Sequence, residues 1–285
     1  SHTEYSLFDG ISRIGELVSH VKEMGQTALA ITDHGVMYGA VYLYKECIKQ
    51  GIKPIIGCEI YVTRGSRFDK SGNGKEKLAH LILLAENNEG YQNLIKICSK
   101  AWTEGYYHRP RADHELLEKY HEGLIVTSAC VGGEVPQAIL NGDMDEARKV
   151  IEFYINTFGK DNYFLEIQNH GLPEEAAVRP VLASLAKEYG LGLVATNDFH
   201  YTKKEDARSQ EIKLCISTGK TLDDPYHFHF ANDEFYCKSG DEMRAILGNF
   251  PGAIENTRVI ADRCNVELTF GEHKLPSFDV PEGET

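Results

Sequence analysis

The chain has 285 residues, with 43 acidic side chains against 30 basic ones and a formal net charge of −13. The length allows one large domain or two modest ones, and a hydrophobic content of 42% excludes wholesale disorder. The charge argues against a domain whose whole surface binds duplex DNA, but it does not exclude a nucleic-acid enzyme, because metal sites need carboxylates.

Short apolar runs alternate with longer amphipathic stretches along the first 200 residues. In chain order we expect a helix over 13–24, a strand over 29–32, a helix over 41–50, strands over 55–62 and 80–85, a helix over 91–102, a strand over 124–128, a helix over 145–158, a strand over 163–168, a helix over 174–189 and a strand over 193–196. Several helices end in glycine, as is typical of helix C-termini. The alternation predicts a mostly parallel α/β sheet and favours a closed barrel over a doubly wound sheet.

The pattern changes in three places. Residues 64–77 are polar and rich in Gly, Ser and Lys, which predicts a surface loop. After residue 202 we expect helices over 205–217, 241–247 and 253–264 with one short strand near 234–238. The tail 275–285, with two prolines, is typical of a linker. We therefore predict a barrel over 1–202, a mainly helical part over 203–274 that packs on or completes the barrel, and a linker over 275–285.

The cellular location is predicted from what the sequence lacks. The longest apolar run, residues 81–85, is too short to cross a bilayer, and the N-terminus has no basic or apolar signal region. The seven cysteines are scattered and odd in number, without a CxxC pair, which favours reduced thiols. We therefore expect a soluble, cytoplasmic protein with no membrane partner.

Polar residues stand where the predicted strands end, which is where parallel α/β folds collect functional groups. Glu59 lies within an otherwise apolar strand, where burial is costly unless the carboxylate is paired or binds a cation. The other candidates are His2, Asp9, Asp33, His34, Cys130, Asp198 and His200. This mixture of N, O and S donors suits Zn²⁺, Mn²⁺ or Fe²⁺ better than Ca²⁺ or Mg²⁺. It exceeds the needs of one ion, so we expect two or three metals and phosphoester hydrolysis, or else an α/β enzyme of different chemistry.

Six ordered motifs carry a family resemblance. They are His-Thr-Glu-Tyr-Ser-Leu-Phe-Asp-Gly (2–10), Ile-Thr-Asp-His-Gly (31–35), Gly-Cys-Glu-Ile-Tyr-Val (57–62), Ala-His-Leu-Ile-Leu-Leu-Ala-Glu-Asn (79–87), Thr-Ser-Ala-Cys-Val-Gly-Gly-Glu (127–134) and Ala-Thr-Asn-Asp-Phe-His-Tyr (195–201). They resemble the PHP (polymerase and histidinol phosphatase) domain, and more narrowly that of the bacterial replicative DNA polymerase III alpha subunits. The end of the chain is similar to the stretch that leads into the polymerase core of that family.

The resemblance implies a distorted (β/α)7 barrel with a helical C-terminal extension and two or three divalent metals, Zn²⁺ or Mn²⁺ with Fe²⁺ as an alternative. The implied ligand sets are His2, Glu59 and Asp198 for the first metal; Glu59, His80 and Cys130 for the second; and Asp9, His34 and His200 for the third. Asp33 is expected to orient the His34 imidazole or cap a turn, and His170 is a candidate for phosphate binding. His227 and His229 match no motif, and we expect them to be structural.

The resemblance departs from the family pattern at one point. The first motif of the family is His-x-His, and His2 matches its second histidine, so the first would precede residue 1. Either the given chain is trimmed at its start, or the first metal position lacks one imidazole.

The implied function is 3′–5′ exonuclease proofreading during DNA replication, with water activated by the metals as nucleophile and no side chain assigned as a separate base. Nucleotidyl transfer would belong to the downstream polymerase domains. The implied partners are the DNA primer 3′ end, those domains, a sliding clamp, a clamp loader and a separate exonuclease subunit. Two alternatives stay open: an inactive scaffold that docks the separate exonuclease, and a free-standing phosphatase of the histidinol phosphate type.

Overall fold

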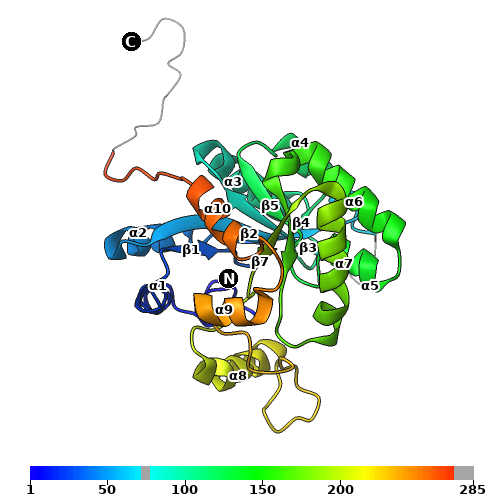
Figure 1. The fold of residues 1–285 in the computed structure, drawn as a ribbon. Coiled ribbons are helices and arrows are strands. Elements are labelled where there is room, and N and C mark those ends of the chain that lie inside the picture. The colour runs from blue at the N-terminus through cyan, green and yellow to red at the C-terminus, as the bar shows by residue number, and fades with distance from the viewer. Residues whose placement is uncertain (72–77, 273–285) are drawn as a thin grey trace, which may run out of the picture.

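The computed structural model describes residues 1–71 and 78–272 (Figure 1). The predicted linker and parts of the predicted 64–77 loop and 203–274 helical region lie outside the described residues. The predicted fold class is confirmed: a curled, mostly parallel sheet is flanked by helices and followed by a helical C-terminal part. The predicted division at residue 202 stays a prediction. No helix in the described ranges combines the length and apolar character needed to span a membrane.

The sheet contains every strand predicted up to residue 196 and one more. Its strands are β1 (Ala28–Ile31), β2 (Lys53–Val62), β3 (Ala79–Ala85), β4 (Arg111–Ala112), β5 (Leu124–Thr127), β6 (Tyr163–Ile167) and β7 (Gly192–Ala195). Their order is β1-β2-β3-β5-β6-β7, and the two-residue β4 pairs with the end of β2. Strand β3 runs antiparallel to both neighbours, while the other pairs are parallel. Among the described residues no ladder joins β1 to β7, so the barrel is not closed by hydrogen bonds there.

The helices also follow the prediction, with two additions. They are α1 (Ile14–Glu23), α2 (Ala40–Gln50), α3 (Asn88–Thr103), α4 (His114–Lys119), α5 (Glu134–Leu140), α6 (Met144–Phe158), α7 (Pro173–Tyr189), α8 (Ala207–Thr218), α9 (Gly240–Leu247) and α10 (Glu255–Arg263). Helices α4 and α5 are additional. The strand predicted near 234–238 is wrong, because that segment forms only an isolated bridge between Tyr201 and Tyr236.

The two faces of the sheet have different partners, because successive side chains of a strand point to opposite sides. One face, which includes Ile60, Leu83 and Leu165, packs against α3 to α7 in the largest apolar core. The other face carries Ile55, Leu84, Ile125, Phe164 and Val194, which pack against Ile260, Ala261 and Cys264 at the end of the chain's last described helix, α10. Helix α10 therefore covers the inner side of the curled sheet.

The same inner face positions the polar residues. On β2, Glu59 lies four residues beyond Ile55, and on β3, His80 lies four residues before Leu84. Since β3 is antiparallel to β2, the start of β3 lies beside the end of β2, where Tyr61 pairs with His80. The apolar positions therefore lie at the α10 end of the inner face, and Glu59 and His80 lie at the other.

Candidate metal centre

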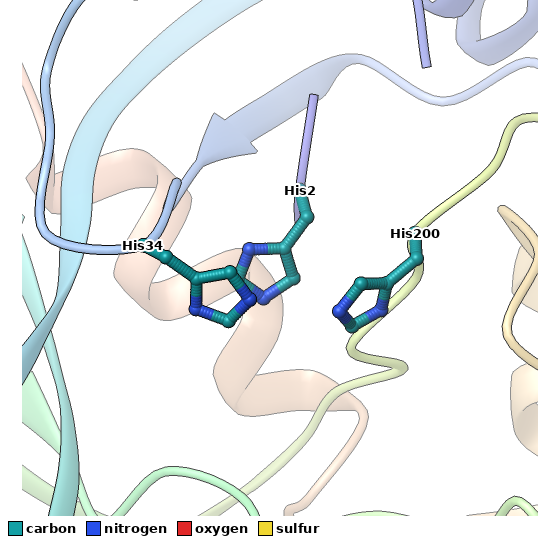
Figure 2. Close-up of side chains that lie close together, drawn as sticks. All are labelled: His2, His34 and His200. Atoms are coloured by element: carbon teal, nitrogen blue, oxygen red, sulfur yellow. The ribbon is translucent and has the colours of Figure 1, made fainter. Parts of the chain in front are cut away.

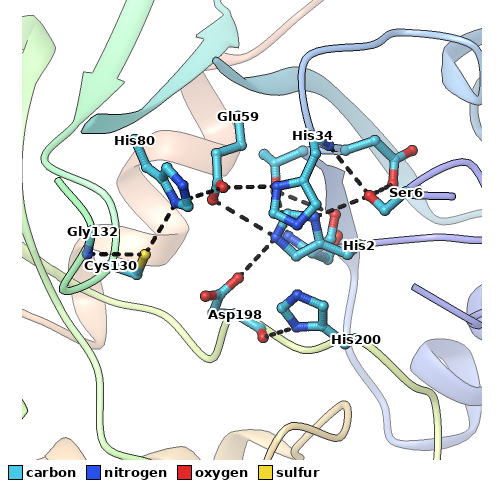
Figure 3. Close-up of polar contacts among 12 residues, drawn as sticks. His2, Ser6, His34, Glu59, His80, Cys130, Gly132, Asp198 and His200 are labelled. Atoms are coloured by element: carbon cyan, nitrogen blue, oxygen red, sulfur yellow. Dashed lines mark hydrogen bonds and ion pairs between the residues drawn. The ribbon is translucent and has the colours of Figure 1, made fainter. Parts of the chain in front are cut away.

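The eight predicted ligands come together at the end of the inner face that lies away from α10. Figure 3 labels all of them except Asp9, and Figure 2 shows three of the histidines. His2 and Asp9 come from the N-terminal segment, and His34 from the loop after β1. Strands β2 and β3 supply Glu59 and His80. The loops after β5 and β7 supply Cys130, Asp198 and His200.

Glu59 stands at the centre of the cluster and is only 2% exposed. Its Oε1 lies 2.9 Å from His34 Nδ1 and 2.9 Å from His80 Nδ1, and its Oε2 lies 3.7 Å from His2 Nε2 (Figure 3). Glu59 Oε1 and His34 Nδ1 are nevertheless buried without an aligned hydrogen bond within the described residues. Buried donor atoms that converge without such alignment fit a cage that holds a cation.

The first two predicted ligand sets are each compact. His2 Nε2 lies 2.9 Å from Asp198 Oδ1, and Cys130 Sγ lies 3.5 Å from His80 Nδ1. Within each set, which shares Glu59, the donor atoms all lie within 4.8 Å of one another. Glu59 therefore belongs to both groups of close donor atoms, and its bridging of two metals stays a prediction.

The third predicted set lies beside the first. Asp9 Oδ2 lies 3.3 Å from His34 Nε2 and 3.7 Å from His200 Nε2. His2 is close to this set as well, because its ring centroid lies 3.9 Å from that of His34 and 4.3 Å from that of His200 (Figure 2). His2 therefore lies between the donors expected for the first and third metals.

Burial and mutual charge shift the pKa values of the cluster. Burial alone would raise the pKa of Asp9, but contact with His34 outweighs it and lowers the value to about 2. Burial also lowers the pKa of His200 to about 4, and the neighbouring His2 adds to that shift. The Cys130 thiol has a pKa well above its ordinary value because it is buried near Asp198 and Glu59. A cation would favour the thiolate and the neutral imidazoles that metal ligation requires.

The Asp33 side chain was predicted to orient the His34 imidazole or to cap a turn. Its hydrogen bonds go instead to the N-terminal segment. Its carboxylate accepts hydrogen bonds from Thr3 N at 2.6 Å, Thr3 Oγ1 at 2.8 Å and Ser6 Oγ at 2.7 Å. Ser6 Oγ in turn lies 3.1 Å from His2 Nδ1 (Figure 3). With the Ser6 hydrogen committed to Asp33, His2 Nδ1 is the donor, which leaves the Nε2 lone pair directed at Asp198 and Glu59.

Two backbone positions beside the cluster are unusual. Asp198 has φ of 40°, and Ala129, which precedes Cys130, has φ of 59°. Non-glycine residues rarely adopt this left-handed region, and such strain is typical of functional sites. The turns after β5 and β7 thus present Cys130 and Asp198 at some conformational cost.

His170 was predicted to bind phosphate, but its side chain is buried and its ring nitrogens contact other protein atoms. The residue is 1% exposed, its Nδ1 lies 2.5 Å from Glu175 Oε1, and its Nε2 lies 2.5 Å from the carbonyl oxygen of Asn197. The ring also stacks on Phe235. Both ring nitrogens have protein partners, and the contact with the Asn197 carbonyl stabilises the turn over residues 197–200. His227 pairs with Glu211 at 2.8 Å, outside the cluster, in line with its predicted structural role.

The metal centre opens onto a cleft of about 1110 Å³ that the sequence did not reveal. Asp9, His34 and His80 line its floor, and the other lining side chains include Tyr61, Trp102, Tyr106 and Arg109. Ser6 and Tyr61 lie within the quoted motifs but were not predicted as site residues, and Trp102, Tyr106 and Arg109 lie outside every motif. Ser6 lies between the predicted ligands His2 and Asp9, which is the only sequence signal that could have found it. No local pattern predicts that residues 102–109 line the cleft beside the metal ligands.

Comparisons with known proteins identify the family of the chain. The family described as PHP domain matches residues 1–170. The chain is 47% identical over 281 residues to DNA polymerase III subunit alpha of Treponema pallidum (strain Nichols), which covers 98% of this chain and 24% of that protein. It is also 47% identical over 296 residues to the Thermus aquaticus subunit, covering 100% of this chain and 24% of that protein. The chain thus spans about a quarter of the length of these relatives.

Among solved structures, an amidohydrolase from Chromobacterium violaceum is 15% identical with a TM-score of 0.47, covering 74% of this chain and 94% of that one. The family match is far stronger, since it spans more than half of the chain and contains most of the predicted ligands. The chain belongs to the PHP domain family.

Proposed function

We propose that this chain is the PHP domain of a bacterial DNA polymerase III alpha subunit and that it removes nucleotides from the 3′ end of DNA in a metal-dependent reaction. One observation carries the proposal: seven further residues with N, O or S donors gather with the buried Glu59 carboxylate, and three of them, Asp9, His34 and His80, line an open cleft. The similarity to polymerase III alpha subunits, which extends over 98–100% of this chain, supports DNA as the substrate.

The residues fit two or three divalent metals. The first would be held by His2, Glu59 and Asp198, the second by Glu59, His80 and Cys130, and the third by Asp9, His34 and His200. The metals would supply Lewis-acid activation of water and charge neutralisation at phosphorus. The imidazoles and the thiol exclude Ca²⁺ as the natural occupant and favour Zn²⁺, Mn²⁺ or Fe²⁺.

Other residues of the chain would hold the metal ligands in position. Ser6 and Asp33 fix His2 so that its Nε2 faces the cluster. Glu59 Oε1 lies 2.9 Å from both His34 Nδ1 and His80 Nδ1, so one carboxylate oxygen is shared by the two imidazoles. The cleft lined by Asp9, His34 and His80 leaves the cluster accessible to a DNA end, while His2, Glu59 and His200 are buried.

The wider context is part of the same proposal. Polymerisation would belong to the downstream part of the relatives that this chain does not cover. A sliding clamp, a clamp loader, a separate exonuclease subunit and a cytoplasmic location follow from that context and stay predictions.

The direct test measures hydrolysis by the metal-loaded chain on a 5′-labelled primer with a mismatched 3′ end, and on a small phosphomonoester. We expect the primer to shorten one nucleotide at a time and a chelator to stop the reaction. Glu59→Gln should lose more than about 100-fold in rate, since losing even an outer-sphere partner of a metal costs about 10–100-fold. The matched control Glu16→Gln, on an exposed acid of α1, should keep the rate. A contaminating nuclease would cleave equally in both preparations, so the loss in Glu59→Gln alone would exclude one.

Two results would contradict the proposal. Cleavage of the monoester alone would indicate a phosphatase of the histidinol phosphate type. Tightly bound metal without hydrolysis of either substrate would indicate a scaffold that docks another exonuclease.

A further inference from the structure

One wall of the cleft carries aromatic side chains that the metal centre does not use. Trp102, at the end of α3, stacks on Tyr106 with ring centroids 5.3 Å apart and an interplanar angle of 12°. The two side chains are 42% and 46% exposed, although they are large and apolar. Exposed apolar surface gathered in a cleft is typical of a ligand-binding site.

This stacked pair is fixed relative to the metal centre. Trp102 Nε1 donates a hydrogen bond to the carbonyl oxygen of Gly35 at 2.8 Å, and Gly35 directly follows the predicted ligand His34. The ring is therefore anchored at one edge while its pair remains open to the cleft. We call Trp102 and Tyr106 the aromatic platform.

Arg109 supplies a cation to the same cleft. It is exposed, and its guanidinium lies 5.7 Å from the Tyr61 ring and 5.8 Å from the Phe8 ring. The Tyr61 ring lies 5.4 Å from that of His80. No carboxylate within the described parts of the chain forms an ion pair with Arg109. Its charge is thus available to an anion.

The backbone around Arg109 is held in an uncommon conformation. Tyr107 and Arg109 form an antiparallel bridge around His108, whose φ of 60° is left-handed. A non-glycine residue in that region costs energy that the fold must offset elsewhere. The tight turn keeps Arg109 at the cleft.

We infer that the aromatic platform and Arg109 bind the unpaired 3′-terminal nucleotides of single-stranded DNA, with a base stacked on the platform and a backbone phosphate on Arg109. Aromatic side chains stack on any base, and neighbouring cations hold the backbone, which is how sequence-tolerant single-strand binding works. The cleft of about 1110 Å³ is large enough for more than one nucleotide. A paired end offers no free base face, so a frayed or mismatched end is preferred. This inference rests on the proposed function.

The test uses the fluorescence of Trp102, which is the only tryptophan of the 285-residue chain. The metal-loaded chain is titrated with a short oligothymidylate whose phosphorothioate linkages resist cleavage, and with an abasic oligomer of the same length. We expect saturable quenching by the oligothymidylate and little by the abasic oligomer, because quenching requires a base against the ring. A blunt hairpin duplex should bind at least about tenfold more weakly.

Variants separate stacking from general binding. Tyr106→Leu should weaken oligothymidylate binding about tenfold and Tyr106→Phe should not, since the ring and not the hydroxyl forms the platform. Arg109→Gln should weaken binding and reduce its salt dependence by about one phosphate contact. The matched controls Phe270→Leu and Arg13→Gln change exposed residues that do not line the cleft and should bind like the parent chain. Circular dichroism verifies that each variant is folded.

The outcomes distinguish this inference from the proposed function. Quenching without any DNA hydrolysis would support the platform and overturn the exonuclease proposal. Normal hydrolysis with no quenching, or equal quenching by the abasic oligomer, would overturn the platform and leave the exonuclease proposal standing.

Discussion

Ser6 controls which nitrogen of His2 faces the metal centre. Its hydroxyl donates to Asp33 Oδ1 at 2.7 Å and lies 3.1 Å from His2 Nδ1. Groups that orient a ligating imidazole in this way raise metal affinity because they fix the tautomer and the ring plane. The role of Ser6 is therefore to position His2 and not to bind metal.

Ser6→Ala should lower the affinity for at least one metal by about 10–100-fold, because the His2 ring loses its fixed tautomer. Competition with a chromophoric chelator measures this affinity. Ser19→Ala on α1, far from the cluster, serves as the control and should bind metal as the parent chain does. Unchanged affinity in Ser6→Ala would show that His2 is held by other contacts.

The protonation of the cluster makes metal binding depend on pH. Burial opposes the charged form of His34 and His80, but the nearby Glu59 outweighs it and raises both pKa values. Burial raises the pKa of Cys130, so this thiol is protonated at pH 7. Ligation requires neutral imidazole and thiolate, and these protons must therefore leave when a metal binds.

Metal binding at pH 7 should release protons, and affinity should fall as the pH decreases, because protons then compete for the same donors. Calorimetric titration in buffers of different ionisation enthalpy counts the protons released. Cys130→Ser should release fewer of them. Binding with no proton release would mean that His34, His80 and Cys130 are not the ligands.

At the scale of elements, α10 is the part of the C-terminal region that completes the inner core of the sheet. Ile260 is 4% exposed and packs with Ile55, Phe164 and Val194, whereas its neighbour Val259 is 45% exposed. Helix α10 thereby shields the apolar half of the inner face from water.

Ile260→Ala should lower the free energy of unfolding by about 2–5 kcal/mol, because it leaves a cavity between α10 and the sheet. Val259→Ala, one position away on the exposed side, should change it by less than about 0.5 kcal/mol. Urea unfolding measures both, with an unchanged slope as evidence that only stability differs. Equal effects of the two substitutions would contradict this packing.

The elements that could be predicted are those with a long periodic pattern. Apolar periodicity located the main strands and the long helices, since burial on one face requires it. It could not reveal that β3 is antiparallel, because side chains alternate in either direction. The six-residue α4, the seven-residue α5 and the two-residue β4 are too short to show a period.

The site also contains residues that could be predicted from the sequence and residues that could not. Glu59 was predictable because an acid in an apolar strand needs a compensating partner. His170 was misjudged because its burial depends on Glu175 and Asn197, which the fold brings to it. Arg109 and Trp102 lie over the centre only because the turn after α3 folds back toward the loop after β1, as the Trp102–Gly35 hydrogen bond shows.

Across the whole molecule, the metal centre joins segments that are remote in the chain. The donors extend from His2 to His200, and the N-terminal segment reaches them through backbone hydrogen bonds from His2 N to Phe199 O at 2.9 Å and from Thr32 N to Ser1 O at 3.0 Å. An unfolded chain cannot keep such donors together. Bound metal should therefore act as a cross-link specific to the native state.

Removing metal should lower the melting temperature of the whole chain in one cooperative transition. A metal that binds only the native state at 100 times its Kd adds about 2.7 kcal/mol to the free energy of unfolding. Differential scanning calorimetry with buffered Zn²⁺ or Mn²⁺, against the chelated chain, measures the shift. Glu59→Gln should lose most of this metal-dependent shift, because Glu59 belongs to two of the ligand sets, while Glu16→Gln should retain it. Identical melting with and without metal would mean that the folded donors form no site and that their convergence has another cause.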